Sequence, residues 1–376
     1  MPKSSHDRSS EGASAAPSEP PPERVAPAKP AVEPPDSPPS PLIRYQPDGP
    51  VATEYRVGLC AWQDKSMLEE GSFYPIKSMK AEERLWWYSR FFDAVEVNST
   101  FYAPLSAQNA VLWTKRTPPG FLFSVKAYAL LTGHHLDAGR LPPPLAALLP
   151  ASARANARGQ LENGVFGEDA REWAFAAFRE GLQPLADAGK LGYVLFQMAP
   201  WVKYGDRALE YLAGLPARLP GTTIAVELRD ASWLPRHTEE TLKVLSERGL
   251  TYVSVDAPRT PASVDTTVAL TAPTAVIRLH GRNREGFMKQ LQGRAPSVAE
   301  KYGYLYDRAE LAGIVARGRA LAGQARRVYF KLNNNVGDAP AINGEDIKAL
   351  LGLETTDRAV VLEEWRSRRR AGPTRP

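Results

Sequence analysis

Eight short apolar segments recur between residues 55 and 353, and most are separated by stretches with helical character. The predicted strands lie at 55–60, within 94–102, and at 121–127, 191–198, 222–228, 250–256, 274–280 and 327–333. The predicted helices lie at 81–92, 107–116, 168–188, 206–215, 239–247, 308–322 and 344–353. Apolar strands that alternate with helices are typical of a parallel sheet covered on its faces. Eight such units predict an α/β fold with a single TIM-like (β/α) barrel.

An open, doubly wound sheet is the alternative arrangement of the same elements. Polar residues stand at the carboxyl ends of nearly all the predicted strands, as in the pairs Glu227/Arg229 and Arg278/His280. An open sheet collects such residues at one switch point, whereas a barrel collects them from every strand. The distribution therefore favours the barrel.

The segment 94–102 shows the pattern in its clearest form. Val95 and Val97 alternate with Glu96 and Asn98, which is the period of two that a strand requires. Glu96 and Asn98 therefore point to the same side of the sheet. A carboxylate at the end of a buried strand is costly unless it has a partner or a chemical task.

The chain divides by composition into an extension, a body and a tail. Residues 1–50 hold 14 of the 34 prolines and almost no large apolar residue before Leu42, so we predict a disordered extension there. Residues 51–353 form the predicted barrel domain, with a partly helical insertion at 137–165. Residues 354–376 form a basic tail, and its last five arginines, Arg366, Arg368, Arg369, Arg370 and Arg375, supply as much positive charge as the net +5 of the chain.

Charge, cysteine content and hydropathy limit the partners that we expect. The body is close to neutral, so charge alone indicates no nucleic-acid footprint across it. Cys60 is the single cysteine, which fits the predicted cytoplasmic location. No apolar core follows a basic start and no apolar run reaches 18 residues, so neither a secretory signal nor a membrane span is expected. The oligomeric state is left open.

Several motifs give the chain a family resemblance. They are Val-Glu-Val-Asn-Ser-Thr-Phe-Tyr at 95–102, Phe-Ser-Val-Lys-Ala at 123–127, Val-Glu-Leu-Arg at 226–229, Arg-Leu-His-Gly-Arg at 278–282 and Asn-Asn at 333–334. On these motifs the chain resembles the domain of unknown function 72 family, the YecE-like proteins, over about residues 55–352. The resemblance implies a β/α barrel but no particular reaction. Asp230 stands where the family tends to have histidine.

Glu96 and Glu227 are the candidate catalytic carboxylates. One buried carboxyl group can act as an acid while a second stays ionised as base or nucleophile. Their strands lie far enough apart in a barrel to place them across a pocket, as a glycosidase requires. The alternative is structural: Glu96 pairs with Lys126, and Glu227 pairs with Arg229 or Arg278.

His280 is the third candidate catalytic residue. A histidine at a strand end can transfer protons or bind a metal, or it can be a hydrogen-bonded structural residue. Glu96, Glu227, Asp256 and His280 together offer ligands for a divalent cation. No tight ligand spacing supports such a site, so no metal ligands are assigned and no cofactor is expected beyond this divalent-metal alternative.

The candidate substrate-binding residues are of three kinds. Lys126, Arg229 and Arg278, with Arg282 and Arg284 nearby in sequence, suit an anionic ligand unless they pair with the carboxylates. Asn98, Gln197 and Asn333 can orient a ligand by hydrogen bonds. Tyr102 can stack on it or pack the barrel rim. No glycine-rich phosphate loop or dinucleotide motif is present, so ATP and NAD are not indicated.

Two functional interpretations follow. The first is an enzyme, of the hydrolase, isomerase or lyase type, that acts on a small polar, anionic or sugar-like substrate through acid/base carboxylates at the barrel mouth. The second is a non-catalytic barrel protein that binds a small ligand or nucleic acid.

Overall fold

The computed structural model describes residues 40–258, 260, 266–294 and 297–371. Residues 1–39 of the predicted disordered extension lie outside the described residues. Residues 40–50 are described and contact the body, because the short strand β1 (Leu42–Ile43) pairs in parallel with β10 (Ala269–Leu270).

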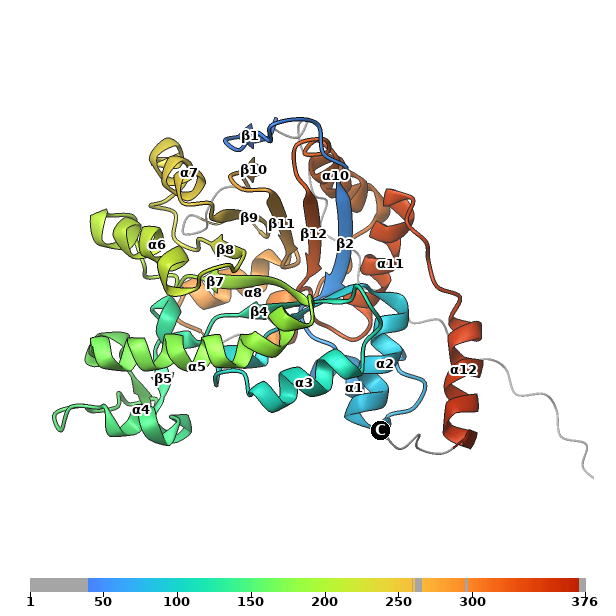
Figure 1. Ribbon diagram of the computed structural model, residues 1–376, viewed down its shortest axis with the longest axis horizontal. Coiled ribbons are helices and arrows are strands. Elements are labelled where there is room, and N and C mark those ends of the chain that lie inside the picture. Colours follow the sequence, from blue (N-terminus) through green and yellow to red (C-terminus); the bar gives the residue numbers. More distant parts are fainter. Residues whose placement is uncertain (1–39, 259, 261–265, 295–296, 372–376) are drawn as a thin grey trace, which may run out of the picture. The chain divides into compact units, whose positions relative to one another are not determined.

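Eight strands form one parallel sheet. They are β2 (Glu54–Leu59), β3 (Ala94–Val97), β4 (Leu122–Lys126), β7 (Leu191–Gln197), β8 (Ile224–Glu227), β9 (Thr251–Asp256), β11 (Thr274–Leu279) and β12 (Arg327–Leu332). Their order is β2-β12-β11-β9-β8-β7-β4-β3 and every neighbouring pair is parallel (Figure 1). This order follows the chain around a ring without a reversal, which a doubly wound sheet does not do. The predicted barrel is therefore confirmed.

The ring is closed between β2 and β3 by a side chain. No ladder of backbone hydrogen bonds joins these two strands among the described residues. Instead, the N–H of Leu59 donates to the Tyr88 hydroxyl at 2.8 Å, and this hydroxyl donates to the carbonyl of Ala94 at 2.9 Å. A Cβ atom on Gly58 would lie 1.9 Å from that carbonyl oxygen, so only glycine lets the two strands approach this closely.

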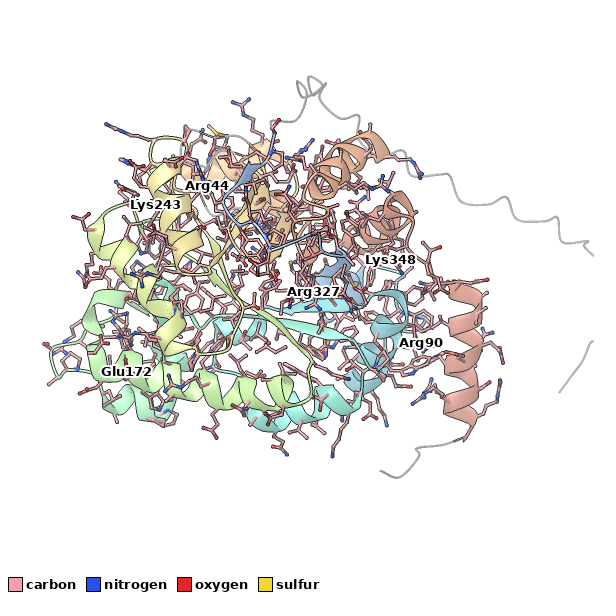
Figure 2. All side chains as sticks on the ribbon, turned by 45° about the horizontal axis from the view of Figure 1, so that its top comes forward. Arg44, Arg90, Glu172, Lys243, Arg327 and Lys348 are labelled. Carbon is pink, nitrogen blue, oxygen red and sulfur yellow. The ribbon has the colours of Figure 1, made fainter. Side chains whose placement is uncertain are left out.

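Helices cover the outside of the ring. The long ones are α2 (Ala81–Phe91), α3 (Ala107–Lys115), α5 (Glu168–Asp187), α6 (Asp206–Arg218), α7 (Thr238–Glu247), α10 (Arg308–Arg319) and α11 (Ala339–Leu351). Each corresponds to a predicted helix. Their outward faces carry exposed charges, including Arg90, Glu172 and Lys243 (Figure 2). The last of them, α11, begins five residues before the predicted 344 because Pro340 is accommodated in its first turn.

The shorter elements lie outside the regular β/α pattern. They are α1 (Lys65–Glu69), α4 (Pro143–Ala147), α8 (Arg284–Leu291), α9 (Val298–Tyr302), and the antiparallel pair β5 (Leu136–Asp137) and β6 (Gln160–Leu161). The described residues also form four short 3-10 helices: η1 (Ser99–Phe101), η2 (Ala129–Thr132), η3 (Ala138–Arg140) and η4 (Asn163–Val165). The insertion predicted at 137–165 therefore contains α4, η3, η4 and most of the β5–β6 pair.

The C-terminal segment predicted as a basic tail contains a helix, α12 (Arg358–Ala371). Val361 and Trp365 of this helix are buried, and Arg368 lies over the ring of Trp86 in α2 at 4.9 Å from its centroid. Packing therefore fixes one face of the segment. Along the described part of the chain, no helix combines the length and apolar character needed to cross a bilayer.

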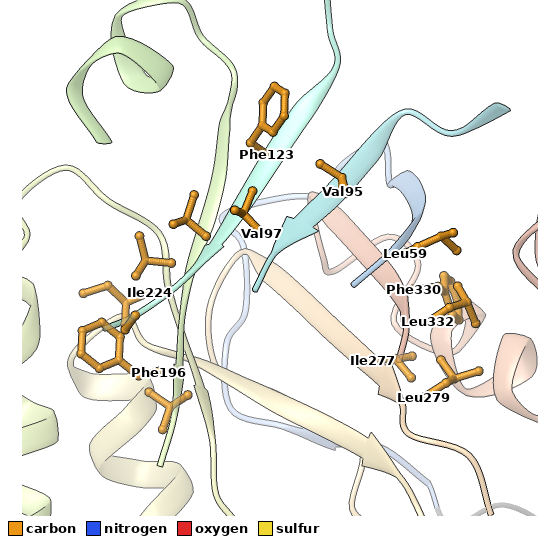
Figure 3. Close-up of a cluster of buried hydrophobic side chains, with 14 of the residues drawn as sticks. Leu59, Val95, Val97, Phe123, Phe196, Ile224, Ile277, Leu279, Phe330 and Leu332 are labelled. Atoms are coloured by element: carbon orange, nitrogen blue, oxygen red, sulfur yellow. The ribbon is translucent and has the colours of Figure 1, made fainter. Parts of the chain in front are cut away.

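Alternating side chains form two apolar layers. Val95, Val97 and Phe330 belong to the large outer layer between strands and helices (Figure 3). Tyr193 and Tyr329 belong to a small inner cluster that fills the barrel. Because every second residue of a strand points inward, the inner face also receives the polar residues at the strand ends.

Candidate binding site at the carboxyl ends of the strands

The period of two places charged residues from different strands inside the barrel. Glu96 follows Ala94 on the inner face of β3, and Arg278 follows Val276 on the inner face of β11. Glu227 similarly follows Ala225 in β8. Glu96, Glu227 and His280 are fully buried, and Arg278 is 1% exposed. Buried charges need partners, and these residues supply them to one another.

The guanidinium of Arg278 joins the two candidate catalytic carboxylates. Its Nη2 donates to Glu96 Oε1 at 2.6 Å, and its Nη1 donates to Glu227 Oε2. The structural alternative for Glu227 matches this contact with Arg278, and Arg229 adds a contact of 3.1 Å between its Nη1 and Glu227 Oε1. The structural alternative for Glu96 was an ion pair with Lys126. In the structure, Glu96 forms its ion pair with Arg278 instead.

The remaining carboxylate oxygens are also occupied. The Tyr193 hydroxyl donates to Glu96 Oε2 at 3.0 Å. Gln197 Nε2 donates to Glu227 Oε1 at 2.6 Å, and His280 Nε2 lies 3.2 Å from the same oxygen. All four carboxylate oxygens therefore have hydrogen-bond partners within the protein.

These contacts keep both carboxylates ionised. Burial acts to raise the pKa of Glu96, but the charge and hydrogen bond of Arg278 outweigh it and hold the pKa below its ordinary value. Burial likewise acts to raise the pKa of Glu227, and Arg278, His280 and Arg229 together hold the pKa well below it. Neither carboxyl group has the raised pKa of a general acid.

His280 lies in the same network as a neutral ring. Its Nδ1 is 2.8 Å from Asn333 Nδ2, and its Nε2 faces Glu227. Burial lowers the pKa of His280 to about 4, although Glu227 acts in the opposite direction. A neutral ring that accepts from Asn333 at Nδ1 donates from Nε2 to the carboxylate, so the hydrogen bonds fix one tautomer.

A small cavity of about 170 Å³ lies at the carboxyl ends of the strands. Its walls are formed by Asn98, Phe101, Tyr102, Lys126, Gln197, Arg278, Tyr302, Asn333 and Asn335. Six of the seven predicted substrate-binding residues are among them. The seventh, Arg229, and the predicted catalytic residues Glu96, Glu227 and His280 are absent from the lining. Glu96, Glu227 and His280 lie behind it, bonded to the wall residues Arg278 and Asn333, and Arg229 contacts Glu227.

Lys126 differs from the other charged groups of the site. Its ammonium lies 4.4 Å from the centroid of the Phe101 ring, and it forms no hydrogen bond or ion pair with any described residue. Burial lowers the pKa of Lys126 to about 8, and the positive charges of Arg278 and Arg229 act in the same direction. Glu96 and Glu227 oppose this shift but do not cancel it.

Asn98 and Tyr102 occupy the side of the cavity near the barrel closure. Asn98 Nδ2 donates to the carbonyl of Cys60 at 2.7 Å and so links the chain after β3 to the chain after β2. Tyr102 is 65% exposed and stands at the rim. Cys60 itself is buried, and burial raises the pKa of its thiol far above the ordinary range.

Asp256 belongs to a separate cluster. It receives two hydrogen bonds from Arg282, at 2.8 and 2.7 Å, and one from Arg317 at 2.9 Å. Arg282 therefore pairs with Asp256 and does not line the cavity. Within the described ranges, no group of three His, Cys, Asp or Glu side chains is arranged to hold a metal ion.

Three wall residues, Phe101, Tyr302 and Asn335, were not among the predicted site residues. Tyr302 ends the short helix α9, and its ring centroid lies 6.1 Å from that of His280. Burial acts to raise the pKa of the Tyr302 phenol, but the nearby charges of Arg229 and Lys301 lower it overall. Nothing periodic marks α9 in the sequence. Asn335 was visible only as the last of three consecutive asparagines after the eighth strand.

Comparison with known proteins agrees with the fold. Residues 56–367 match the family described as "Protein of unknown function DUF72". The UPF0759 protein YunF of Bacillus subtilis (strain 168) is 31% identical over 301 residues, which are 79% of this chain and 95% of YunF.

Two crystal structures of DUF72 family proteins have a similar fold. The protein from Thermotoga maritima MSB8 is 27% identical with a TM-score of 0.61, over 79% of this chain and 99% of that one. The protein from Enterococcus faecalis V583 is 23% identical with a TM-score of 0.64, over 81% of this chain and 98% of that one.

Proposed function

This chain belongs to the family described as "Protein of unknown function DUF72", and we propose that it is an enzyme that acts on a small, polar, anionic molecule bound at the mouth of its barrel. The reaction is acid/base chemistry carried out by groups on the cavity wall. The buried carboxylates behind the wall hold those groups in place.

The observation that carries this proposal is the unpaired charge of Lys126. Glu96 and Glu227 are paired with Arg278, and Glu227 also contacts Arg229. Lys126 and the fully buried Lys331 are left as further cations near these carboxylates, with no ion-pair partner among the described residues, and of the two only Lys126 lines the cavity. An anion in the cavity would balance this excess positive charge. A protonated ammonium that is partly desolvated gains more from such a partner than one in water.

The rest of the wall suits a polar ligand. Amide groups of Asn98, Gln197, Asn333 and Asn335 border the cavity, and the rings of Phe101 and Tyr102 supply apolar surface. Small-molecule sites commonly combine a few convergent polar groups with apolar walls. The volume of about 170 Å³ favours a molecule of metabolite size over a polymer segment.

The groups placed to transfer protons are Lys126 and Tyr302. Both line the cavity, and the pKa of each is lowered toward the working range. Glu96, Glu227 and His280 are positioning residues in this proposal, because they touch wall residues and not the cavity. A glycosidase is disfavoured, since that reaction requires two carboxyl groups that face the substrate.

Ligand binding can be tested with pairs of small molecules that differ only in charge, such as lactate and lactamide. Binding of the anion, followed by thermal unfolding or calorimetry, is expected for the unaltered chain and weaker or absent for Lys126→Met. The matched control is Lys115→Met, which removes an exposed lysine from α3 and is expected to change nothing. Equal binding of lactate and lactamide by the unaltered chain would count against an anion site.

Turnover is tested separately, with panels of small anionic substrates of hydrolases, isomerases and lyases. Product formation that disappears in Lys126→Met supports the enzyme. Anion binding without turnover across the panels supports the alternative, a non-catalytic binding protein.

A further inference from the structure

We infer that Lys126 is a nucleophile, and that its amine condenses with the carbonyl carbon of a small anionic aldehyde or ketone to form an imine. This inference rests on the proposed function, because it uses the same cavity and the same anionic ligand. It adds a substrate class, the short oxo acids, and a covalent step.

The position of Lys126 gives its amine access to a ligand. The side chain leaves the last residue of β4 and lines the cavity, with the Phe101 ring against its ammonium. Lys331, the other lysine on an inner strand face, is fully buried and absent from the cavity wall. Lys190 is held by three hydrogen bonds, to Thr114 and Thr117. Of these three lysines, Lys126 alone can meet a molecule in the cavity.

The surroundings of Lys126 favour a free amine over a permanent cation. A residue that only had to attract an anion would be better served by an amine that keeps its proton. Here the wall is apolar on one side, and Arg278 and Arg229 supply positive charge on the other. Desolvation and a neighbouring cation are the two devices by which proteins activate a lysine as a nucleophile.

The consequence for reactivity is large. An exposed lysine with a pKa of about 10.4 is less than about 1% neutral at pH 8. Lys126, with its pKa lowered to about 8, is about half neutral at that pH. Only the neutral amine has the electron pair that attacks a carbonyl carbon.

The step is balanced without any oxidant or reductant. The nitrogen electron pair forms the C–N bond while the carbonyl π electrons move to oxygen, which takes one proton from the nitrogen. The C–O bond then breaks, and the hydroxyl leaves as water with the second nitrogen proton. Amine plus carbonyl therefore gives imine plus water. Tyr302, on the same wall, is the group placed to relay these protons.

The test traps the imine in the full-length protein. The protein is incubated at pH 8 with glyoxylate and sodium cyanoborohydride, which donates hydride to an imine carbon. The mass of each trapped lysine increases by that of one glyoxylic acid molecule less one oxygen atom. Peptide mass mapping is expected to find Lys126 modified at least about tenfold faster than the exposed Lys65 and Lys115. Lys126→Arg is expected to lose this adduct, because a guanidinium does not form it.

An experiment with lactate distinguishes failure of this inference from failure of the proposed function. It has the carboxylate of an oxo acid but no carbonyl group, so it can occupy an anion site without reacting. If lactate shields Lys126 from acetylation by acetic anhydride while glyoxylate leaves Lys126 unmodified, the imine is overturned and the anion site stands. If neither acid shields or modifies Lys126, both proposals fail.

Preferential trapping at Lys126 that lactate slows supports both proposals. Modification of Lys126, Lys65 and Lys115 at equal rates overturns the imine, because it shows reaction without a site. This comparison within the unaltered chain does not depend on whether Lys126→Arg folds.

Discussion

The hydroxyl of Tyr88 donates a hydrogen bond of 2.9 Å to the carbonyl of Ala94, the first residue of β3. The same hydroxyl accepts from the N–H of Leu59 in β2. One side chain from helix α2 thus takes the place of the missing backbone ladder between the two end strands of the sheet. The position of Glu96, two residues after Ala94, depends on this closure.

Replacing Tyr88 by phenylalanine should destabilise the protein with little change in apolar packing. The change leaves a buried N–H and a buried carbonyl without their partner, at a cost of about 1–3 kcal/mol in the free energy of unfolding. Urea denaturation measures this. Tyr102→Phe, at a tyrosine that is 65% exposed, is the control and should stay within about 0.5 kcal/mol of the unaltered chain. Equal stability of the two variants would show that the bridge contributes nothing.

Replacing Arg278 by methionine should be the most damaging single change in the site. It leaves Glu96 and Glu227 buried without their shared cation, and breaking a buried ion pair in this way costs about 3–5 kcal/mol. Chemical denaturation at pH 7 measures the loss. Adding Glu96→Gln and Glu227→Gln to the same chain should recover part of it, because neutral amides then replace the two buried carboxylates that had lost their shared cation. A triple variant less stable than Arg278→Met alone would contradict this account.

The Arg278→Met variant should also differ from the unaltered chain in how its stability depends on pH. In the unaltered chain the pKa of Glu96 and of Glu227 is lower folded than unfolded, so the folded state binds fewer protons. Their stabilisation is present above the ordinary pKa of 4.5 and is lost as the pH falls through the folded-state values. Without Arg278, burial raises both pKa values, so acidification from pH 7 to 5 should narrow the stability gap between variant and unaltered chain. A gap that widens over this range would count against the ion-pair account.

His280 makes a second pH-dependent contribution to stability, over a different pH range. Its pKa falls from 6.5 unfolded to about 4 folded, so its stabilisation is complete above pH 6.5 and is lost as the pH falls toward 4. His134, whose pKa is lowered by burial to about 3, contributes in the same direction. His280→Gln should therefore remove about one of the protons taken up on unfolding near pH 5, which calorimetry in buffers of different ionisation enthalpy measures. An unchanged proton uptake would mean that the His280 ring is charged in the folded protein.

Strand and helix positions were predictable because their signals are local. Val95, Glu96, Val97 and Asn98 show their period of two within four residues, and the eight strands repeat it. The inner face of each strand followed from the same alternation. Most of the cavity wall was found in this way, from polar residues at strand ends such as Lys126 and Gln197.

The pairing inside the site was not predictable, because it depends on distances across the barrel. Glu96 lies closer in sequence to Lys126 than to Arg278. Even so, the side chain of Arg278 extends from β11 across the barrel and contacts both carboxylates. Arg278 thereby frees Lys126 from pairing. Tyr302 was missed because the short helix α9 lies outside the repeating β/α pattern. The Tyr88 bridge was missed because it joins a helix to two strands, and no local period in the sequence shows such a contact.

The pH dependence of Lys126 tests its two proposed roles in opposite directions. Burial and the charges of Arg278 and Arg229 lower the pKa of its amine, Glu96 and Glu227 oppose them, and the pKa is left at about 8. Binding of lactate needs the protonated amine, so affinity should fall as the pH rises through 8, and titration calorimetry from pH 6.5 to 9.5 follows this. Imine formation with glyoxylate needs the neutral amine, so the trapping rate should rise over the same range when every sample is reduced at one fixed pH, because the hydride adds to the protonated imine. In Lys126→Arg, lactate affinity should stay level across it, because a guanidinium keeps its charge. If lactate affinity and trapping rate changed in the same direction in the unaltered chain, one amine could not serve both roles.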